Sequence, residues 1–273
     1  MRKNWGQWFL SDVKRAIKDY AMLSPGDKVA VGLSGGKDSM ALLYILAYLR
    51  DYSHLSFSIE AVFVDPGWTE VDLTALSAFC TAQKVPLHVV RYPIAQIIAE
   101  RGERSTCSLC AKLRMGLLNS RAKALGCQRV ALGHHLDDVI ETFFLNLLYA
   151  GYLKTFRPAV YLDRIGLHLI RPLSYLPEKT LSGLVAREGI PVLPPLCPYA
   201  GKTQRAVMKE IVRFFSERYP EFYKRFRRAL ENVSFSDLWR QRRGKISWSL
   251  ERVKGEIGDD HNHNGDDSGQ GNH

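Results

Sequence analysis

The chain lacks the features that mark several classes of protein. In its 273 residues no stretch reaches about 18 uninterrupted apolar residues, so no transmembrane helix is expected. No continuous apolar run follows Met1, so the start does not read as a secretory signal. Five cysteines are too few, and odd in number, for a disulfide scaffold; free, metal-bound or reactive thiols in a reducing compartment fit better. We therefore expect a cytoplasmic protein with no membrane partner.

The chain also has fewer acidic residues than basic ones. The chain has 28 Asp and Glu against 38 Lys and Arg, a formal net charge of +10, which favours a polyanionic partner. The last segment, residues 255–273, holds five acidic residues and no Lys or Arg, so the rest of the chain carries +15. Because almost no apolar residue occurs there, we expect a disordered acidic tail whose three histidines are solvated.

Basic residues concentrate just before that tail. Residues 205–254 carry fourteen Lys and Arg and six Asp and Glu, with Phe, Tyr and Trp between them. Basic side chains neutralise phosphates and aromatic rings stack on bases, so the pattern is typical of an RNA-binding surface. The alternative is a pair of amphipathic helices whose rings form a core and whose arginines face solvent.

Apolar periodicity predicts an α/β fold. Trp5–Met22 spaces its large apolar residues by three or four, as in an amphipathic helix, and Ser24–Asp27 breaks the pattern. Short β-branched runs then alternate with helical patterns, which predicts a parallel sheet covered by helices on both faces. The expected strands are Lys28–Leu33, Ser58–Val64, Leu87–Arg91 and Arg129–Leu132, and the expected helices are Asp38–Leu49, Val71–Gln83, Ser108–Leu125 and Asp137–Tyr149.

After residue 151 the pattern changes. Tyr161–His168 predicts a hairpin turn between two short strands, and Pro177–Val253 reads as mostly helical. We therefore divide the chain into an N-terminal helix (1–24), an α/β domain (25–176), a basic helical region (177–254) and the tail (255–273).

The most specific motif is Ser34-Gly-Gly-Lys-Asp-Ser39, between a predicted buried strand and a predicted helix. In that place backbone N–H groups and the helix N-terminus can hold an anion, and the glycines permit close approach. Lys37 adds a charge, the serines add hydroxyls, and Asp38 can serve a metal ion or the helix start. The loop is not a Walker A motif, because Asp38 follows the lysine where that motif has Ser or Thr. The alternative is a capped glycine turn.

A second polar string, Gly133-His-His-Leu-Asp-Asp138, follows the fourth predicted strand. A strand end with glycine, paired histidines and paired aspartates is typical of catalytic loops in α/β folds. Asp137 and Asp138 can bind Mg²⁺ or act on a proton. Alternatively, Asp137 only caps the following helix, and one histidine is structural.

Three cysteines have the spacing of a metal site. Cys107 and Cys110 form a C-x-x-C pair, and Cys197 follows far downstream. Thiolates suit zinc or an iron–sulfur cluster; structural zinc usually has four ligands, whereas three cysteines with one open position suit a 4Fe-4S cluster. Spacing alone does not decide between them, and a redox dithiol is a third interpretation. Cys80 and Cys127 have apolar neighbours in the sequence and are expected to be buried thiols that only contribute to packing.

Together these strings resemble the PP-loop ATP pyrophosphatases and, among them, the tRNA 2-thiocytidine synthetase (TtcA) family. The resemblance covers residues 20–235 and rests on SGGKDS, CSLCAKLR, GHHLDDVIETFFLNLLY, RPLSYLPE and the late Cys197, in this order. Members of the family replace the C2 oxygen of a cytidine in the tRNA anticodon loop with sulfur, using ATP, Mg²⁺ and a 4Fe-4S cluster held by three cysteines. One departure is Pro194, which stands where family members often have a further cysteine.

The resemblance implies a role for each motif. Residues 25–176 would be the PP-loop ATPase domain, which adenylates the C2 oxygen of cytidine 32 before sulfur replaces it. The cluster ligands would be Cys107, Cys110 and Cys197. The catalytic residues would be Lys37, Asp38 (also a Mg²⁺ ligand), Asp137 and Asp138. The nucleotide would contact Ser34, Gly35, Gly36, Lys37, Asp38, Ser39, Asp65, Gly133 and His134. The implied partners are tRNA, a cysteine desulfurase or other sulfur donor, and a second copy in a homodimer.

Two other classes of function stay open. A related PP-loop enzyme would form 2-thiouridine or lysidine in tRNA; lysidine synthesis needs no metal-binding cysteines, so the three-cysteine set speaks against it. A non-enzymatic nucleotide- or RNA-binding module would bind RNA and leave ATP intact.

Overall fold

The computed structural model describes residues 7–101, 106–198 and 204–239. Within these ranges no helix has the length and apolar character of a membrane span. Residues 1–231 form one compact unit and residues 232–273 a second, whose described part contains a short 3₁₀ turn, η2 (Phe235–Asp237). The predicted acidic tail, the end of the predicted basic region (240–254) and Trp5 lie outside the described residues.

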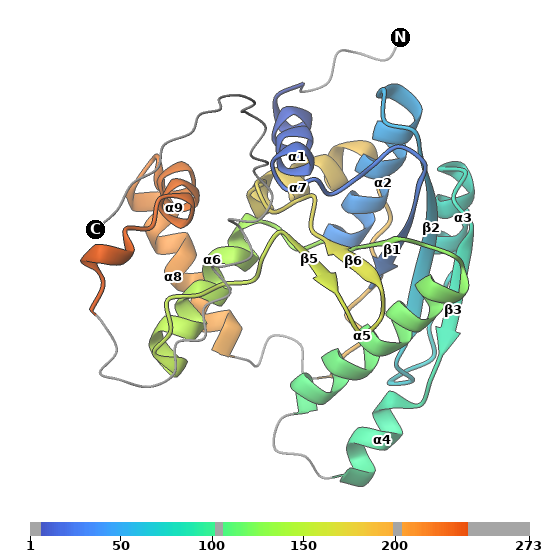
Figure 1. Cartoon of the computed structure of the whole chain (residues 1–273). Helices are drawn as coiled ribbons and strands as arrows, with labels where there is room; N and C mark the ends of the chain where they lie inside the picture. The colour runs from blue at the N-terminus through green and yellow to red at the C-terminus, as the bar shows by residue number, and fades with distance from the viewer. Residues whose placement is uncertain (1–6, 102–105, 199–203, 240–273) are drawn as a thin grey trace, which may run out of the picture. The chain divides into compact units, whose positions relative to one another are not determined.

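A sheet of six described strands forms the centre of the first unit (Figure 1). Its order is β3–β2–β1–β4–β6–β5, and every neighbouring pair is parallel except β5 with β6. The strands are β1 (Asp27–Leu33), β2 (Phe57–Asp65), β3 (Leu87–Arg91), β4 (Arg129–Ala131), β5 (Ala159–Leu162) and β6 (Leu167–Ile170). The expected parallel sheet is confirmed for all strands except β5, which pairs antiparallel with β6, and the predicted hairpin supplies these two strands.

Helices cover both faces of the sheet, because its strands are apolar on both sides. In β1, Val29, Val31 and Leu33 enter a core cluster with α1, α2, α3 and α7, while Ala30 enters a second cluster with α4 and α5. These helices are α1 (Gln7–Asp19), α2 (Lys37–Tyr52), α3 (Thr74–Ala82), α7 (Glu178–Glu188), α4 (Ile94–Arg101) and α5 (Thr106–Ala124).

A third apolar cluster lies among helices outside the sheet layers. α6 (Leu136–Leu145), followed by the π-helical turn η1 (Asn146–Ala150), packs with α8 (Gln204–Arg218) and α9 (Phe222–Glu231). The buried members of this cluster are Leu136, Val139, Ile140 and Val212, with aromatic rings packed around them. This helical lobe therefore has its own small core.

Two helices differ from the expectation. The apolar periodicity did not predict α4, whose buried residues are Ile94 and Ile98. A helix of eight residues holds about two turns, which is too short for a periodic pattern to stand out from a loop. The helix expected over Asp137–Tyr149 ends at Leu145, where the chain passes into η1.

Candidate functional site

Three loops meet at one edge of the sheet. β1 and β4 are parallel neighbours, so the loops after them (34–39 and 133–138) leave the sheet side by side. β6 is the next strand, and Arg171–Glu178 follows it at the same edge. β1 also pairs with β2, so this edge lies where the strand order reverses, which is the usual ligand site of such sheets.

The loop after β1 is shaped by its own serines. Ser34 N–H donates to Ser39 Oγ (3.1 Å), and Ser39 Oγ donates to the Gly36 carbonyl (2.9 Å). Gly35 has a φ of +77°, a conformation that favours glycine. Gly36 precedes α2 and has no side chain to cap it, so the first N–H groups of α2, from Lys37 on, can bind an anion.

Gly133 brings the loop after β4 against the start of α2. A Cβ at this position would lie 2.9 Å from the carbonyl carbon and oxygen of Asp38 and from Ser39 N, closer than side chains tolerate. The two predicted nucleotide-binding loops are therefore in backbone contact. Asp65 ends β2, and its Oδ1 accepts a hydrogen bond from Gly67 N–H (2.9 Å).

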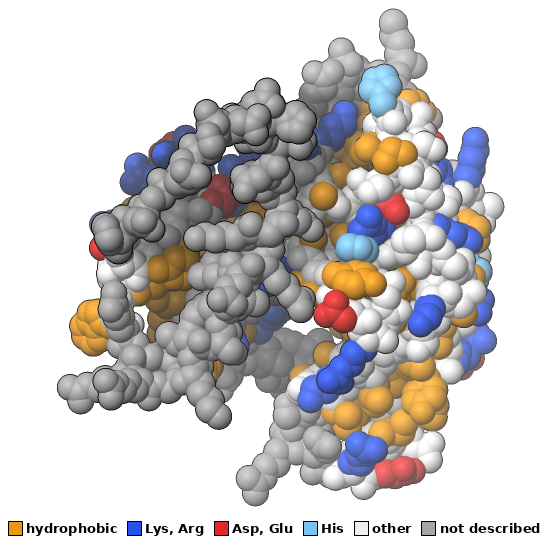
Figure 2. Space-filling view, viewed as in Figure 1, with side chains coloured by type: hydrophobic (Ala, Val, Ile, Leu, Met, Phe, Trp, Pro, Cys, Tyr) orange, Lys and Arg blue, Asp and Glu red, His pale blue; other side chains and the backbone are white. Residues whose placement is uncertain are grey.

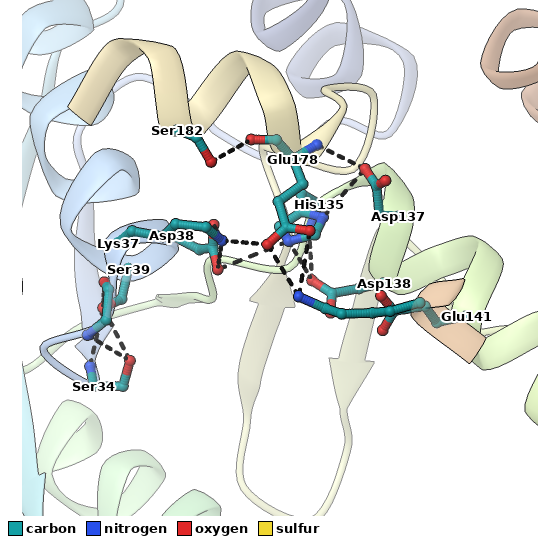
Figure 3. Close-up of polar contacts among 12 residues, drawn as sticks. Ser34, Lys37, Asp38, Ser39, His135, Asp137, Asp138, Glu141, Glu178 and Ser182 are labelled. Atoms are coloured by element: carbon teal, nitrogen blue, oxygen red, sulfur yellow. Dashed lines mark hydrogen bonds and ion pairs between the residues drawn. The ribbon is translucent and has the colours of Figure 1, made fainter. Parts of the chain in front are cut away.

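Lys37 lies in a cluster of charged side chains from three helices (Figure 3). Its Nζ is 2.8 Å from Asp38 Oδ1 and 2.6 Å from Oε1 of Glu178, the first residue of α7. Lys209 of α8 donates to the same carboxylate at 3.1 Å. Burial opposes ionisation of Glu178, but Lys37 and Lys209 outweigh it and lower its pKa to about 2. Burial likewise lowers the pKa of Lys37, but Asp38 and Glu178 outweigh it, so the pKa is raised.

The two aspartates of the loop after β4 bind different helix starts. Asp138 Oδ2 accepts a hydrogen bond from His135 N–H (3.0 Å) and so caps α6. Asp137 accepts one from Glu178 N–H (2.6 Å) at the start of α7 and one from the Tyr223 hydroxyl of α9 (2.6 Å). Asp137 therefore ties α6, α7 and α9 together, while Asp138 caps the following helix.

The two histidines of this loop have different surroundings. His135 is 2% exposed, and its Nε2 lies 3.4 Å from an Asp138 oxygen and 3.7 Å from an Asp38 oxygen, between the two loops. Burial lowers the pKa of His134 to about 4, so this ring is neutral near pH 7. His134 Nδ1 accepts a hydrogen bond from Arg171 Nε at 3.2 Å. His135 is thus the histidine that contacts the acidic groups.

Glu141 of α6 is a buried carboxyl beside this cluster. Its side chain is 1% exposed, and among the described residues neither oxygen accepts a hydrogen bond; Arg205 Nε lies 3.6 Å from Oε2. Burial and the charges of Asp138 and Glu178 raise the pKa of Glu141 to about 7, against the lowering effect of Arg205 and Lys209. Glu141 is therefore partly protonated near neutral pH.

The free energy of unfolding of a Glu141→Gln variant should depend on pH differently from that of the wild type. The folded-state pKa exceeds the unfolded value of 4.5, so the stability that Glu141 contributes is complete below pH 4.5 and is lost as the pH rises through about 7. Glutamine does not ionise, so the variant should gain on the order of 3 kcal/mol over the wild type across this window. Urea unfolding at about pH 5 and about pH 8 measures the difference. Glu100→Gln, on the exposed face of α4, is the control, and an equal shift there would contradict the assignment.

The three predicted ligand cysteines lie near one another. Cys107 and Cys110 are in the first turn of α5, and Cys197 is in the segment after α7. Burial raises the pKa of Cys110; Arg114 opposes this, and the thiols of Cys197 and Cys107 reinforce it. Cys110 is thus close enough to Cys107 and Cys197 for their charges to affect its pKa. The remaining cysteines, at 80 and 127, are buried in the core, as expected of packing thiols.

The three predicted ligand cysteines are soft donors. Within the ranges that the structure describes, no three His, Cys, Asp or Glu side chains form a group that could hold a metal ion. All five cysteines are free thiols, and the donor set of Cys107, Cys110 and Cys197 is the soft one that iron–sulfur clusters take.

One contact joins the loop after β1 to the segment that carries Cys197. Leu193 N–H donates to the Gly35 carbonyl at 2.9 Å, and a Cβ on Gly35 would lie 2.6–2.9 Å from Leu193 side-chain atoms. Leu193 precedes Cys197 by four residues, which span at most about 14 Å. The anion-binding loop and the third predicted ligand therefore belong to one local structure.

Half of the described rings of the predicted RNA surface pack inside the helical lobe, whereas Phe214, Tyr219, Phe235 and Trp239 are exposed. Phe215 stacks on Phe144 and on Phe222, with ring centroids 5.8 Å and 5.6 Å apart. The side chains of Arg213 and Arg225 are instead 74% and 79% exposed. Figure 2 shows Lys and Arg side chains over α9, at the upper left, with acidic ones among them. An RNA surface here would therefore rest on exposed cations and on the exposed rings of Phe214 and Tyr219, not on the packed rings.

Sequence reasoning missed Glu178, Lys209 and Leu193 as site residues. Glu178 follows Pro177, and an acidic residue in a first helical turn is a readable signal for the start of α7. Its pairing with Lys37 and Lys209 depends on how distant helices pack, for which the sequence carries no periodic signal.

The chain is similar in sequence to known proteins. The profile of the PP-loop domain matches residues 9–192. The tRNA-cytidine(32) 2-sulfurtransferase of Teredinibacter turnerae is 39% identical over 233 residues, covering 83% of this chain and 76% of that protein. The protein of the same name from Neisseria meningitidis serogroup C is 40% identical over 231 residues, covering 82% and 71%.

Among solved structures, the U34-tRNA thiolase NcsA from Methanococcus maripaludis, described with its 4Fe-4S cluster, has a similar fold. The TM-score is 0.67 at 24% identity, covering 83% of this chain and 81% of that one. At this identity the likeness supports the fold described above.

Proposed function

Because the chain belongs to the tRNA 2-thiocytidine synthetase (TtcA) family of PP-loop proteins, we propose that it replaces the C2 oxygen of cytidine 32 in tRNA with sulfur and consumes ATP. The structural observation that carries the proposal is the Leu193–Gly35 contact, which joins an anion-binding loop to a cysteine segment. Activation of a base and insertion of sulfur act on the same carbon, so the two sites have to adjoin.

The first step uses the loop after β1. The N–H groups at the start of α2 and the Lys37 ammonium would bind the β and γ phosphates of ATP, and Asp38 would bind Mg²⁺. The C2 oxygen of the base attacks the α phosphorus, and the bond from that phosphorus to the pyrophosphate oxygen breaks. Lys37 stabilises the charge that builds up on the leaving pyrophosphate.

The second step replaces the adenylated oxygen. A sulfur nucleophile adds to C2, the C2–O bond breaks, and AMP leaves. Cys107, Cys110 and Cys197 would hold a 4Fe-4S cluster, whose chemistry when bound is to supply that sulfur. We assign Asp138 to the reacting groups, because it shares the His135 ring with Asp38, and Asp137 to positioning, because it binds α7 and α9.

The family resemblance also supports finer proposals. We infer that tRNA is the RNA partner, that a cysteine desulfurase or other sulfur donor supplies the sulfur, and that two copies form a homodimer. Reduced thiols and a tRNA substrate support a cytoplasmic location.

Expression of the chain in a bacterial strain without 2-thiocytidine should restore this nucleoside at position 32 of tRNA. Mass spectrometry of digested tRNA measures the product. Appearance of 2-thiouridine or lysidine instead would contradict the proposed base. Tight RNA binding with no loss of ATP, in the presence of tRNA and sulfide, would favour a binding module and overturn the enzymatic proposal.

A further inference from the structure

The Lys37 ammonium is held by a side chain from another helix. Its Nζ lies 2.6 Å from Glu178 Oε1, so the cation that the proposed mechanism assigns to phosphate is paired with a carboxylate (Figure 3). The side chains of Lys37 and Glu178 are 30% and 25% exposed, so water screens this pair only in part.

The main chain of Glu178 is fixed, whereas its carboxylate has a second partner. Glu178 N–H donates to Asp137 Oδ2 at 2.6 Å, which holds the start of α7 in place. Lys209 Nζ lies 3.1 Å from Oε1 and 3.3 Å from Oε2 of the same carboxylate. Two ammonium groups therefore share one carboxylate, as they would share a phosphate oxygen.

We propose that Glu178 is a positioning residue that takes the place of a phosphate oxygen beside Lys37 and gives up that place when ATP binds. The inference rests on the proposed function only in that the loop after β1 binds ATP. One ammonium cannot bind the carboxylate and a polyphosphate at full strength, so ATP binding and the Lys37–Glu178 pair compete.

The surroundings of Glu178 make this exchange possible. A cavity of about 1120 Å³ lies between α7 and α8, and Glu178 and Lys209 both line it, so the carboxylate has room to turn away from Lys37. Lys209 remains as its partner there. An unpaired, half-buried carboxylate would be costly. The exchange avoids this cost because Glu178 stays paired with Lys209.

Competition of this kind also selects among nucleotides. A triphosphate brings several charges to the loop and can displace one carboxylate. AMP has no β or γ phosphate and displaces the carboxylate poorly, so it avoids most of the cost of breaking the Lys37–Glu178 pair. Glu178 would thus lower the affinity for ATP more than the affinity for AMP.

Calorimetric titration of the full chain with ATP, with and without Mg²⁺, and with AMP tests the proposal. Glu178→Gln keeps the backbone contact with Asp137 and removes the charge, so it should bind ATP roughly three- to tenfold more tightly, and its affinity for AMP should rise less. Lys209→Met should weaken ATP binding, because displaced Glu178 then lacks a partner. Glu188→Gln, at the other end of α7, where the carboxylate accepts a hydrogen bond from Tyr44, should change nothing. Circular dichroism and thermal melting confirm that each variant is folded.

Competition predicts opposite signs for the two variants. Unchanged or weaker ATP binding by Glu178→Gln would overturn the inference, and weakening confined to samples with Mg²⁺ would identify Glu178 as a metal ligand instead. A wild-type chain that binds no ATP would overturn the proposed function as well, so the two failures are distinguishable.

Discussion

A Lys37→Ala variant should lose tRNA thiolation by about a hundredfold or more, the size of effect seen when one group that stabilises transition-state charge is removed. Lys37 is the lysine of the Ser34–Ser39 loop and the first residue of α2, whose first N–H groups are proposed to bind phosphate. Without it the departing pyrophosphate would lack a cation from the chain. ATP-dependent release of pyrophosphate and formation of 2-thiocytidine are the two measurements.

The fold should survive this change, because Glu178 keeps Lys209 as a partner. Lys28→Ala is the matched control: this lysine lies at the opposite end of β1, where it pairs with Glu60 at 2.8 Å. The control should keep both activities. Full activity of Lys37→Ala would refute the assignment of the loop to phosphate binding.

Combined replacement of Cys107, Cys110 and Cys197 by alanine should remove bound iron and sulfide completely. Protein purified without oxygen should be brown in the wild type and colourless in the triple variant, since these thiols are the proposed cluster ligands. Iron and acid-labile sulfide analysis with the visible spectrum measures the loss, and none of these depends on activity. Thiolation should be lost with the cluster.

Cys127→Ala is the control for this experiment, because Cys127 is a buried core thiol whose pKa burial raises to about 11. The control should keep its iron and sulfide. A colourless wild-type protein that contains zinc and is fully active would refute the cluster.

Local sequence patterns predicted the fold well, because its strands and helices follow from short runs of apolar residues and from the residues that flank them. Strand β1 reads as an apolar run before SGGKDS, and the burial of Val29, Val31 and Leu33 follows from the fact that both sheet faces are covered. The loop after β1 was also readable, since glycines, a lysine and serines at a strand–helix junction together favour the binding of an anion.

The same local patterns did not predict which side chains from distant parts of the sequence contact one another. Asp137 is next to Asp138 in the chain, yet one binds the start of α7 and the other caps α6, and no spacing rule separates them. Glu178 meets Lys37 because α7 packs against α2, and Lys209 reaches Glu178 from α8. Burial of Glu141 within a polar cluster runs against the rule that carboxyls are exposed, which is why its raised pKa had no sequence signal.

The contact between Gly35 and Leu193 has a consequence for building chimaeras from related enzymes. The glycine accepts a hydrogen bond from the leucine and has no room for a side chain of its own beside it. A chimaera should therefore exchange two segments together, residues 34–39 and residues 190–197. Most of the chain's α/β core lies between these segments in sequence. A graft of the cysteine segment alone would place a foreign side chain against Gly35 and disturb the nucleotide loop, whereas transfer of both segments together would preserve their fit.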